Sequence, residues 1–414
     1  MNVLWLNAGL LLPLDKGGKL RTWHLMRHLA RRHAITWLSF AEPDQSPADV
    51  NGMREVAERV VTVPRVDVSK GSIRFHADAA RYLLHAEPYV VAKYRSREYA
   101  WKAAALLRDH RYDLVVCDFL PPIVNMPQVV PCPSVLFTHN VEAEIWRRHV
   151  ETARNPVQRA LLGGQWRRML AFERRALERF GLVLTVSDAD RATFERLYPA
   201  AARRYHVVPT GVDTEHFRVG GPGGGSPRHL VFTGSMDWLP NEDGMLYFCR
   251  EILPLIRLQE PRVTVGIVGR APTPAVLRLA EENGVEVTGR VDDVRPHVAR
   301  AAVSIVPLRI GGGTRLKIFE AMSMGKAVVS TTVGAEGLPV TDGRDIILAD
   351  EPAAFAAAVV RLMRNADERR RIEAAARQLV VARYDWSAVS RELEDALLSF
   401  AGRDRQPEAM QATA

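Results

Sequence analysis

The chain has 414 residues, of which 47% are hydrophobic and 25% are charged, and its formal net charge is +8. Because a single hydrophobic core stops growing at roughly 250 to 300 residues, this length predicts two globular domains. The three cysteines, Cys117, Cys132 and Cys249, have neither metal-ligand spacing nor the number of a disulfide framework, which favours a reducing, cytoplasmic location. The apolar residues 1–12 lack the basic start and cleavage site of a signal peptide and are too few to span a bilayer.

Short apolar, β-rich runs alternate with longer helical patterns through the first half of the chain. The runs have no polar face, which is typical of parallel strands covered by helices on both sides. The alternation predicts a doubly wound, Rossmann-like α/β domain over residues 1–217, with strands at 3–7, 35–40, 114–117, 135–138 and 182–186.

Residues 218–228 are rich in glycine, and segments of this composition act as flexible connectors. We place a linker there. The alternation then restarts and predicts a second domain of the same class over residues 229–385. Beyond it we expect a helix over 386–402 that packs back on the first domain, and a polar tail over 403–414. The strands expected in the second domain are 230–233, 263–268, 285–288, 303–306, 327–330 and 346–348.

Most of the net positive charge lies in the first 180 residues, where an arginine-rich helix is predicted over residues 154–179. Its basic face is either a contact with an anionic membrane or the solvated face of an ordinary amphipathic helix. No recognition motif or aromatic-studded basic sheet accompanies the charge, so we expect no nucleic-acid partner.

Open α/β sheets bind ligands at the loops that follow their strands. After the first strand, Gly17 and Gly18 precede a helix and would let a backbone approach a phosphate, unless they form a plain turn. Their spacing fits neither a dinucleotide fingerprint nor a P-loop, which counts against a dehydrogenase. After the fourth strand predicted above, His139 is either a hydrogen-bond donor to a substrate or a structural histidine.

Similar loops follow the strands of the second domain. Gly234 and Ser235 come directly after its first strand, and Arg270 comes after the next one. The backbone amides, the hydroxyl and the guanidinium would bind oxyanions, with plain connecting turns as the alternative.

The most informative loop contains the three glycines 311–313 and leads into a helix whose first turn holds Thr314, Arg315 and Lys317. Free amides, the positive end of the helix dipole and two cations converge there, as a diphosphate requires. Cations at a helix N-terminus oppose the dipole, so an anion site is favoured over a structural turn. Further along the helix, Glu320 could accept two hydroxyls of a ribose.

Asp188 and Asp190 match an Asp-x-Asp metal motif. They follow Ser187 directly after a strand, and we interpret Ser187-Asp188 as the N-cap of a helix. We expect no metal ion.

These residues resemble glycosyltransferase family four, the retaining enzymes of the GT-B fold. The segment Gly-Ser-Met-Asp-Trp-Leu-Pro-Asn at residues 234–241 resembles the corresponding segment in a subgroup of exopolysaccharide and PEP-CTERM-associated sugar transferases. The resemblance covers nearly the whole chain and rests on Gly17-Gly18, His139, Val-Pro-Thr-Gly-Val-Asp at 208–213 with Phe217, Gly234-Ser235, Thr-Gly-Arg-Val at 288–291, and Glu-Ala-Met-Ser-Met-Gly-Lys-Ala-Val-Val at 320–329.

The resemblance implies a nucleotide-sugar donor held mainly by the second domain and an acceptor held by the first. It places Gly17 and Gly18 near the donor phosphates, His139 at the transferred sugar and Glu320 on the ribose. It also places Gly234 and Ser235 at the diphosphate, Arg290 and Val291 near the base, and the amides of Thr314, Arg315 and Leu316 at phosphate.

The chain departs from the family pattern at two places. The first of two glutamates common in the family falls at Gly312, so Gly312 and Gly313 bind through their backbone or sugar recognition differs. The family's Arg and Lys after the first strand of the second domain are absent too. Arg270, Arg315 and Lys317 are then the candidates that meet the phosphate charge.

The resemblance therefore implies a retaining, metal-independent transfer of a sugar from a nucleoside diphosphate to a glycan or lipid-linked acceptor in glycan or exopolysaccharide biosynthesis. The expected location is the cytoplasm or the inner face of the membrane. Two alternatives stay open: a catalytically silent nucleotide-sugar-binding scaffold, and a sugar-nucleotide epimerase on the same architecture.

Overall fold

The computed structural model describes residues 1–14, 17–43, 45–66, 86–153, 155–201, 204–220, 225–310 and 316–404. Internal contacts divide the chain into two compact units. Unit 1 holds residues 1–209 together with the chain from Ser390 onward, and unit 2 is Thr210–Val389. The first crossing between the units comes before the glycine-rich segment 218–228, of which residues 221–224 lie outside the described ranges.

Unit 1 is built on a seven-stranded sheet with the order β3-β2-β1-β4-β5-β6-β7, and every neighbouring pair is parallel. The strand order reverses between β1 and β4, and the loops at such a switch point leave a crevice for ligands. The strands are β1 (Asn2–Leu6), β2 (Ala34–Ala41), β3 (Arg59–Pro64), β4 (Leu114–Asp118), β5 (Ser134–Phe137), β6 (Leu182–Thr185) and β7 (Tyr205–Val207).

Helices cover the sheet of unit 1, and the central strands are buried along their whole length because apolar side chains point to both faces. The sequence prediction missed β3 and β7, which lie at the two edges of the sheet. The helices are α1 (Gly17–Leu29), α2 (Pro47–Gly52), α4 (Tyr89–Ala92), α5 (Arg97–Asp109), α6 (Glu142–Glu151), α7 (Pro156–Arg179) and α8 (Asp188–Leu197), with the 3₁₀ turns η1 (Met53–Glu55) and η2 (Pro121–Asn125).

Unit 2 is built on a six-stranded parallel sheet with the order β10-β9-β8-β11-β12-β13. Its switch point lies between β8 and β11. The strands are β8 (His229–Thr233), β9 (Thr264–Val268), β10 (Val285–Gly289), β11 (Val303–Val306), β12 (Ala327–Ser330) and β13 (Ile347–Leu348). The α/β class with two doubly wound parallel sheets is thereby confirmed.

The helices of unit 2 pack on one continuous apolar core. A π-helical turn, η3 (Phe248–Ile252), joins α9 to α10. The helices are α9 (Leu239–Tyr247), α10 (Leu253–Gln259), α11 (Pro274–Leu277), α12 (Arg295–Arg300), α13 (Leu316–Ser323), α14 (Pro352–Arg364) and α15 (Ala366–Arg383), with the 3₁₀ turn η4 (Arg278–Glu281).

The last described helix, α16 (Trp386–Asp404), begins in unit 2 and continues as part of unit 1. In unit 1 its buried Glu394 accepts a hydrogen bond from His33 at 2.9 Å, and the ring of Phe400 packs against Gly181. In unit 2 the indole of Trp386 lies so close to Gly211 that a Cβ there would meet the ring at 2.6 Å. Position 211 therefore requires glycine.

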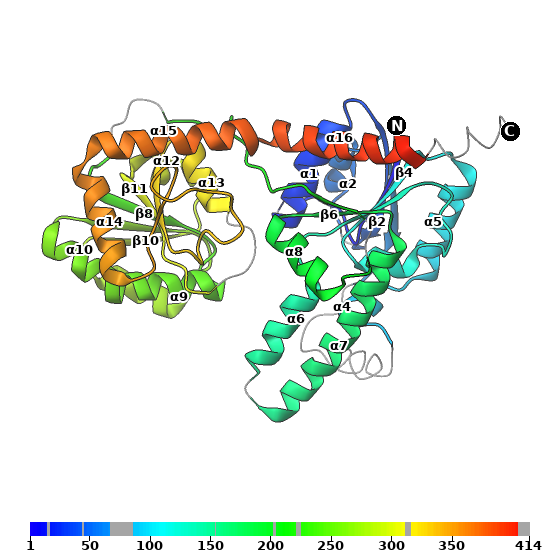
Figure 1. Ribbon diagram of the computed structural model, residues 1–414, viewed down its shortest axis with the longest axis horizontal. Helices are drawn as coiled ribbons and strands as arrows, with labels where there is room; N and C mark the ends of the chain where they lie inside the picture. Colours follow the sequence, from blue (N-terminus) through cyan, green and yellow to red (C-terminus); the bar gives the residue numbers. More distant parts are fainter. Residues whose placement is uncertain are drawn as a thin grey trace. The chain divides into compact units, whose positions relative to one another are not determined.

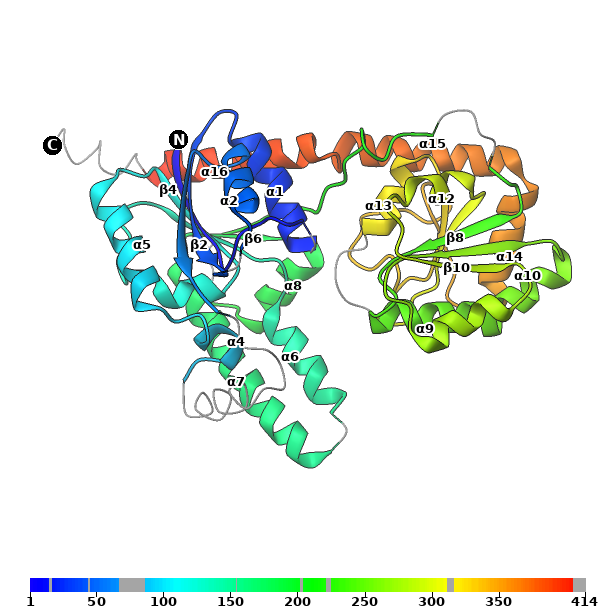
Figure 2. The same ribbon diagram turned by 180° about the vertical axis from the view of Figure 1, so that it is seen from behind.

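Helices α6 and α7 form an antiparallel hairpin that projects from the sheet of unit 1, as both views show (Figures 1 and 2). Buried Glu173 of α7 ties the base of the hairpin together. Its carboxyl group accepts hydrogen bonds from the amides of Glu142 and Ala143, at 2.9 and 3.4 Å, and from the hydroxyl of Tyr198 at 2.7 Å. These contacts satisfy two amides at the start of α6 that have no partner inside the helix.

Burial raises the pKa of Glu173 from the ordinary 4.5 to about 7, and the hydrogen bond from Tyr198 offsets part of this rise. A carboxyl group whose pKa is raised by folding stabilises the fold fully below its unfolded pKa, and this contribution is lost as the pH rises through the folded pKa. We expect the free energy of unfolding to fall by about 2 kcal/mol between pH 5 and pH 8.

The Glu173→Gln variant should lose most of this pH dependence, because it cannot ionise. Urea unfolding at four pH values, followed by a spectroscopic probe in unit 1, measures the effect. Glu178→Gln, which changes an exposed acid on the same helix, is the control and should keep the wild-type slope. An equally steep slope in Glu173→Gln would contradict this assignment.

Candidate functional site

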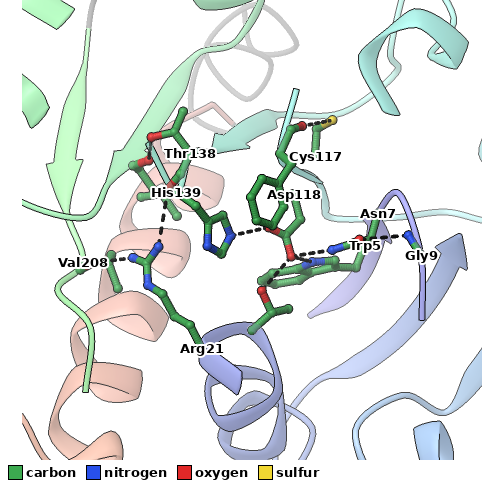
Figure 3. A network of polar contacts seen from close by, with 12 residues as sticks. Trp5, Asn7, Gly9, Arg21, Cys117, Asp118, Thr138, His139 and Val208 are labelled. Carbon is green, nitrogen blue, oxygen red and sulfur yellow. Dashed lines mark hydrogen bonds and ion pairs between the residues drawn. The ribbon is translucent and has the colours of Figure 1, made fainter. Parts of the chain in front are cut away.

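A buried carboxylate stands at the switch point of unit 1, where β4 ends at Asp118 (Figure 3). Its Oδ2 accepts three hydrogen bonds, from Trp5 Nε1 at 3.1 Å, Asn7 Nδ2 at 2.8 Å and Thr22 Oγ1 at 2.8 Å. Its Oδ1 faces the Nε2 of His139 at 2.7 Å. Four donors from β1, α1 and the ends of two strands therefore meet on one side chain.

The imidazole of His139 is 6% exposed and stacks on the ring of Phe119, with 3.8 Å between the ring centroids and 4° between the planes. Because the ionised carboxylate of Asp118 only accepts hydrogen bonds, we assign the ring proton to Nε2, which leaves Nδ1 as an acceptor in the neutral ring. Burial lowers the pKa of His139, although the charge of Asp118 opposes this shift. The ring is therefore neutral at physiological pH.

Arg21 of α1 is also buried, beside His139. Its guanidinium lies 4.4 Å from the centroid of the Phe137 ring and donates to the carbonyl groups of Thr138 and Val208. Burial lowers the pKa of Arg21 to about 9, with Asp118 acting in the opposite direction. The guanidinium thus links the carbonyl groups that follow β5 and β7.

Three of the predicted site residues lie in unit 1, and two of them meet. A Cβ at Gly18 would lie 2.9 Å from the Phe119 ring and 3.7 Å from His139 Nδ1. Gly17 is the exposed first residue of α1, with open space where a Cβ would be. The neighbouring residues 15 and 16 lie outside the described ranges.

In unit 2 the turns after β8 and β9 are pressed together. A Cβ at Gly269 would lie 1.7 Å from the carbonyl oxygen of Gly234, so this position has room only for glycine. The amide of Met236 donates to the carbonyl of Arg270 at 2.9 Å, which fixes the two turns to each other. The Arg270 side chain itself is exposed, and the hydroxyl of Ser235 donates to Asp237 at 2.5 Å.

The side chain of Lys317, in the first turn of α13, reaches the turn that follows β8. Its ammonium donates to Asn241 Oδ1 at 2.7 Å and lies 3.9 Å from the centroid of the Phe232 ring. Asn241 Nδ2 in turn donates to the carbonyl of Ser235 at 2.8 Å. A Cβ at Gly234 would lie 2.7 Å from both Lys317 Nζ and Asn241 Nδ2, so the missing side chain makes room for this cluster.

Glu320 follows Lys317 by one turn of α13 and is half-buried. Burial raises the pKa of its carboxyl group to about 7, while the charge of Lys317 lowers it. Among the residues that the structure describes, no side chain donates a hydrogen bond to this carboxyl group, so its oxygens can accept hydrogen bonds from a ligand.

Two of the other predicted residues, Arg290 and Val291, are not part of this cluster. Arg290 is exposed beyond β10, and Val291 packs with Val231 and Val268 in a small apolar group. Leu316 is the first residue of α13. Gly312, Gly313, Thr314 and Arg315 lie outside the described residues.

The interpretation of Ser187 as an N-cap is confirmed, because its hydroxyl accepts a hydrogen bond from the amide of Asp190 at 3.1 Å. Over the described ranges, no group of three or more His, Cys, Asp or Glu side chains has an arrangement that could hold a metal ion.

Three residues that organise these sites were not predicted from the sequence: Asp118, Arg21 and Asn241. For Asp118 a signal existed, since an acid directly after a continuously apolar strand is at the ligand-binding end of a parallel sheet. Asn241 stands in the segment that carries the family resemblance. The burial of Arg21 has no counterpart in the local sequence, because its acceptors lie more than a hundred residues away.

Two family models match the chain. The model described as "Glycosyltransferase Family 4" matches residues 16–216, and the model described as "Glycosyl transferases group 1" matches residues 227–365. The two matches together span most of the chain.

Curated relatives share part of this length. The D-inositol 3-phosphate glycosyltransferase of Frankia alni is 31% identical over 231 residues, which are 50% of this chain and 56% of the relative. A GDP-mannose-dependent alpha-(1-6)-phosphatidylinositol monomannoside mannosyltransferase of Mycobacterium tuberculosis is 28% identical over 258 residues, 55% of this chain and 66% of the relative. The chain thus spans between half and two thirds of these relatives.

Solved structures show the same fold over the whole chain. Anabaena Alr3699/HepE, solved in complex with UDP, is 15% identical with a TM-score of 0.67, covering 96% of this chain and 100% of that one. Sucrose-phosphate synthase from Thermosynechococcus elongatus is also 15% identical with a TM-score of 0.67, covering 99% and 100%. The fold is GT-B.

We expect Asp118→Asn to destabilise unit 1 by about 2–4 kcal/mol, because the amide nitrogen that replaces one carboxylate oxygen cannot accept the hydrogen bonds made to that oxygen and must face a donor. The ring of His139 should lose its fixed tautomer. Urea unfolding measures the first effect, and ¹⁵N NMR of the histidine ring measures the second. Asp113→Asn at the opposite end of β4, where the carboxylate accepts from the amide of Asn2 at 2.8 Å, is the control. Equal effects of the two substitutions would refute the central role of Asp118.

Proposed function

The chain belongs to glycosyltransferase family four, and from that premise we propose that it transfers a sugar from a nucleoside diphosphate to a hydroxyl acceptor. The observation that carries the proposal is the cluster in unit 2 at Gly234, where Lys317 and Asn241 converge on a strand-end turn that has no side chain of its own. Glycine turns and a cation at the start of a helix suit a diphosphate.

The donor lies on unit 2 in this proposal. Its diphosphate binds at Gly234, Ser235 and Lys317, and its ribose binds the carboxylate of Glu320. Arg290 and Val291 lie near the base. The diphosphate is also bound by the backbone of Gly312 and Gly313, the amides of Thr314, Arg315 and Leu316, and the side chains of Arg270 and Arg315.

Transfer proceeds with retention of configuration and without a metal ion. The bond between the anomeric carbon and the diphosphate oxygen breaks, the acceptor oxygen bonds to the same face of that carbon, and the acceptor proton passes to the leaving diphosphate. Lys317, Arg315 and Arg270 stabilise the charge that develops on the leaving group. His139 orients the transferred sugar, and Gly17 and Gly18 leave room for the donor phosphates. Chelation of divalent ions should leave turnover unchanged.

The acceptor is a glycan or a lipid-linked saccharide of glycan or exopolysaccharide biosynthesis, and the reaction takes place at the inner face of the membrane. The α6–α7 hairpin supports this location. Val157 and Leu161 near the start of α7 are 70% and 51% exposed, and Arg159 and Arg167 on the same helix are exposed too. Apolar side chains flanked by arginines suit the surface of an anionic bilayer.

Within the described ranges, no helix combines the length and apolar character that crossing a bilayer requires. We propose a peripheral, electrostatic membrane contact on the strength of the exposed arginines of α7.

Donor binding tests the proposed function. In a thermal-shift screen with nucleotide sugars and nucleoside diphosphates, a ligand at 100 times its dissociation constant should stabilise the protein by about 2.7 kcal/mol. Gly234→Ala should weaken this binding by roughly tenfold or more, because the new methyl group displaces Lys317 and Asn241. Gly163→Ala in α7, where a Cβ meets nothing within 4 Å, is the matched control. Unchanged affinity in Gly234→Ala would rule out this diphosphate site.

Sedimentation with phosphatidylglycerol vesicles tests the membrane contact. Binding should be strong at 50 mM salt and weak at 500 mM, since salt screens exposed charges. The double charge reversal Arg159→Glu, Arg167→Glu should reduce binding by roughly tenfold or more. The matched reversal Arg371→Glu, Arg383→Glu on α15 should not. No sedimentation even at low salt would refute the contact.

A further inference from the structure

A pocket of about 220 Å³ opens in unit 1 beside His139. It lies past the carboxyl ends of β4 and β5, between α4, the first turn of α6 and α7, and its walls include Val90, Tyr94, Phe119, Glu142 and Met169. Pockets for drug-sized ligands usually measure roughly 300 to 1,000 Å³. This one has room for a single ring.

One side of the pocket is apolar and aromatic. Tyr94 and Phe119 contribute aromatic side chains to the lining, and Val90 and Met169 contribute aliphatic ones. Phe119 has a φ of 69°, a left-handed conformation that is costly for an aromatic residue and that holds the ring against His139. A rigid aromatic wall suits the C–H face of a sugar ring.

The other side of the pocket is polar. Glu142 and Asn140 stand beside His139, and the two side chains are hydrogen-bonded to each other. Burial raises the pKa of Glu142, and the bond from Asn140 lowers it. The amide of Glu142 donates to the carboxyl group of Glu173, so a second acid lies behind the first. Carboxyl and amide groups can accept and donate hydrogen bonds to several hydroxyls of one ring.

The lining holds groups of both charges. Lys93 also lines the pocket, with its ammonium 5.2 Å from the centroid of the Tyr94 ring. The guanidinium of Arg65 lies 4.1 Å from the centroid of the same ring, so these cations gather at Tyr94, whereas the acid Glu142 stands beside His139. An anionic group placed next to Glu142 would meet like charge in a place with little solvent.

We infer that this pocket binds the terminal sugar ring of the acceptor, that the ring is uncharged, and that Glu142 holds its hydroxyls beside His139 and discriminates against a phosphorylated ring. The inference rests on the proposed function and adds the chemical class of the acceptor to it. Glu142 is thereby a specificity-determining residue, and the aromatic wall accounts for affinity rather than selectivity.

Binding to the full chain without donor tests the inference. The probes are methyl α-D-glucopyranoside and methyl α-D-mannopyranoside, each with its 6-phosphate, and saturation-transfer NMR titration gives the dissociation constants. The neutral glycoside should bind roughly tenfold more tightly than its phosphate. Glu142→Gln should bring this ratio close to one by improving the binding of the phosphate. Tyr94→Ala should weaken both ligands and leave the ratio unchanged.

Glu144→Gln is the matched control, because this acid is on the same helix but paired with Arg147 and absent from the pocket lining. A ratio near one in the wild type, or an unchanged ratio in Glu142→Gln with a wild-type melting temperature, would overturn the inference. So would binding of dodecyl glycosides without methyl glycosides, which would identify an apolar chain as the occupant. Absence of binding by any glycoside would overturn it as well.

Donor binding to unit 2, measured separately, distinguishes the two proposals. If nucleotide sugars bind and turn over while Glu142→Gln leaves glycoside binding unchanged, the pocket assignment is wrong and the proposed function stands. If glycosides bind as expected while no nucleotide sugar binds, the proposed function fails.

Discussion

A single buried carboxylate, that of Asp118, organises the ligand-binding end of unit 1. A carboxylate without solvent is stable only when donors surround it, and here the donors come from Trp5 and Asn7 at β1, Thr22 of α1 and His139 after β5. The requirement to satisfy one charge thus fixes the mutual positions of these elements. His139 receives its tautomer and its place beside Phe119 as consequences, whereas burial favours its neutral form.

The buried strands of the fold could be predicted from sequence because they are continuous apolar runs. The strands predicted at 303–306 and 327–330 coincide with β11 and β12, and each of the others differs from the observed bounds by one residue at one or both ends. The strand β3 escaped notice since it is partly exposed at the sheet edge, and β7 because it has three residues. For these edge strands the neighbouring strand supplies the register, and the local pattern carries little information.

The sequence indicates candidate sites only where their chemistry is local. Glycines before a helix and a lysine in its first turn predict phosphate binding, which stays a prediction, and the structure brings Lys317 to Gly234 across the switch point. Arg21 could not be found in this way, because a cation in an amphipathic helix is expected to face solvent. Its burial depends on the carbonyls of Thr138 and Val208, which only the folded sheet places beside it.

Helix α16 has a consequence for how the protein is made. Ser390 and the residues after it complete unit 1, yet the ribosome synthesises them after all of unit 2. Until then His33 lacks Glu394, and the surface at Gly181 lacks Phe400. Domains commonly fold in the order of their synthesis, N-terminal first. Here unit 1 lacks its last helix until unit 2 has been synthesised, so unit 1 is completed last.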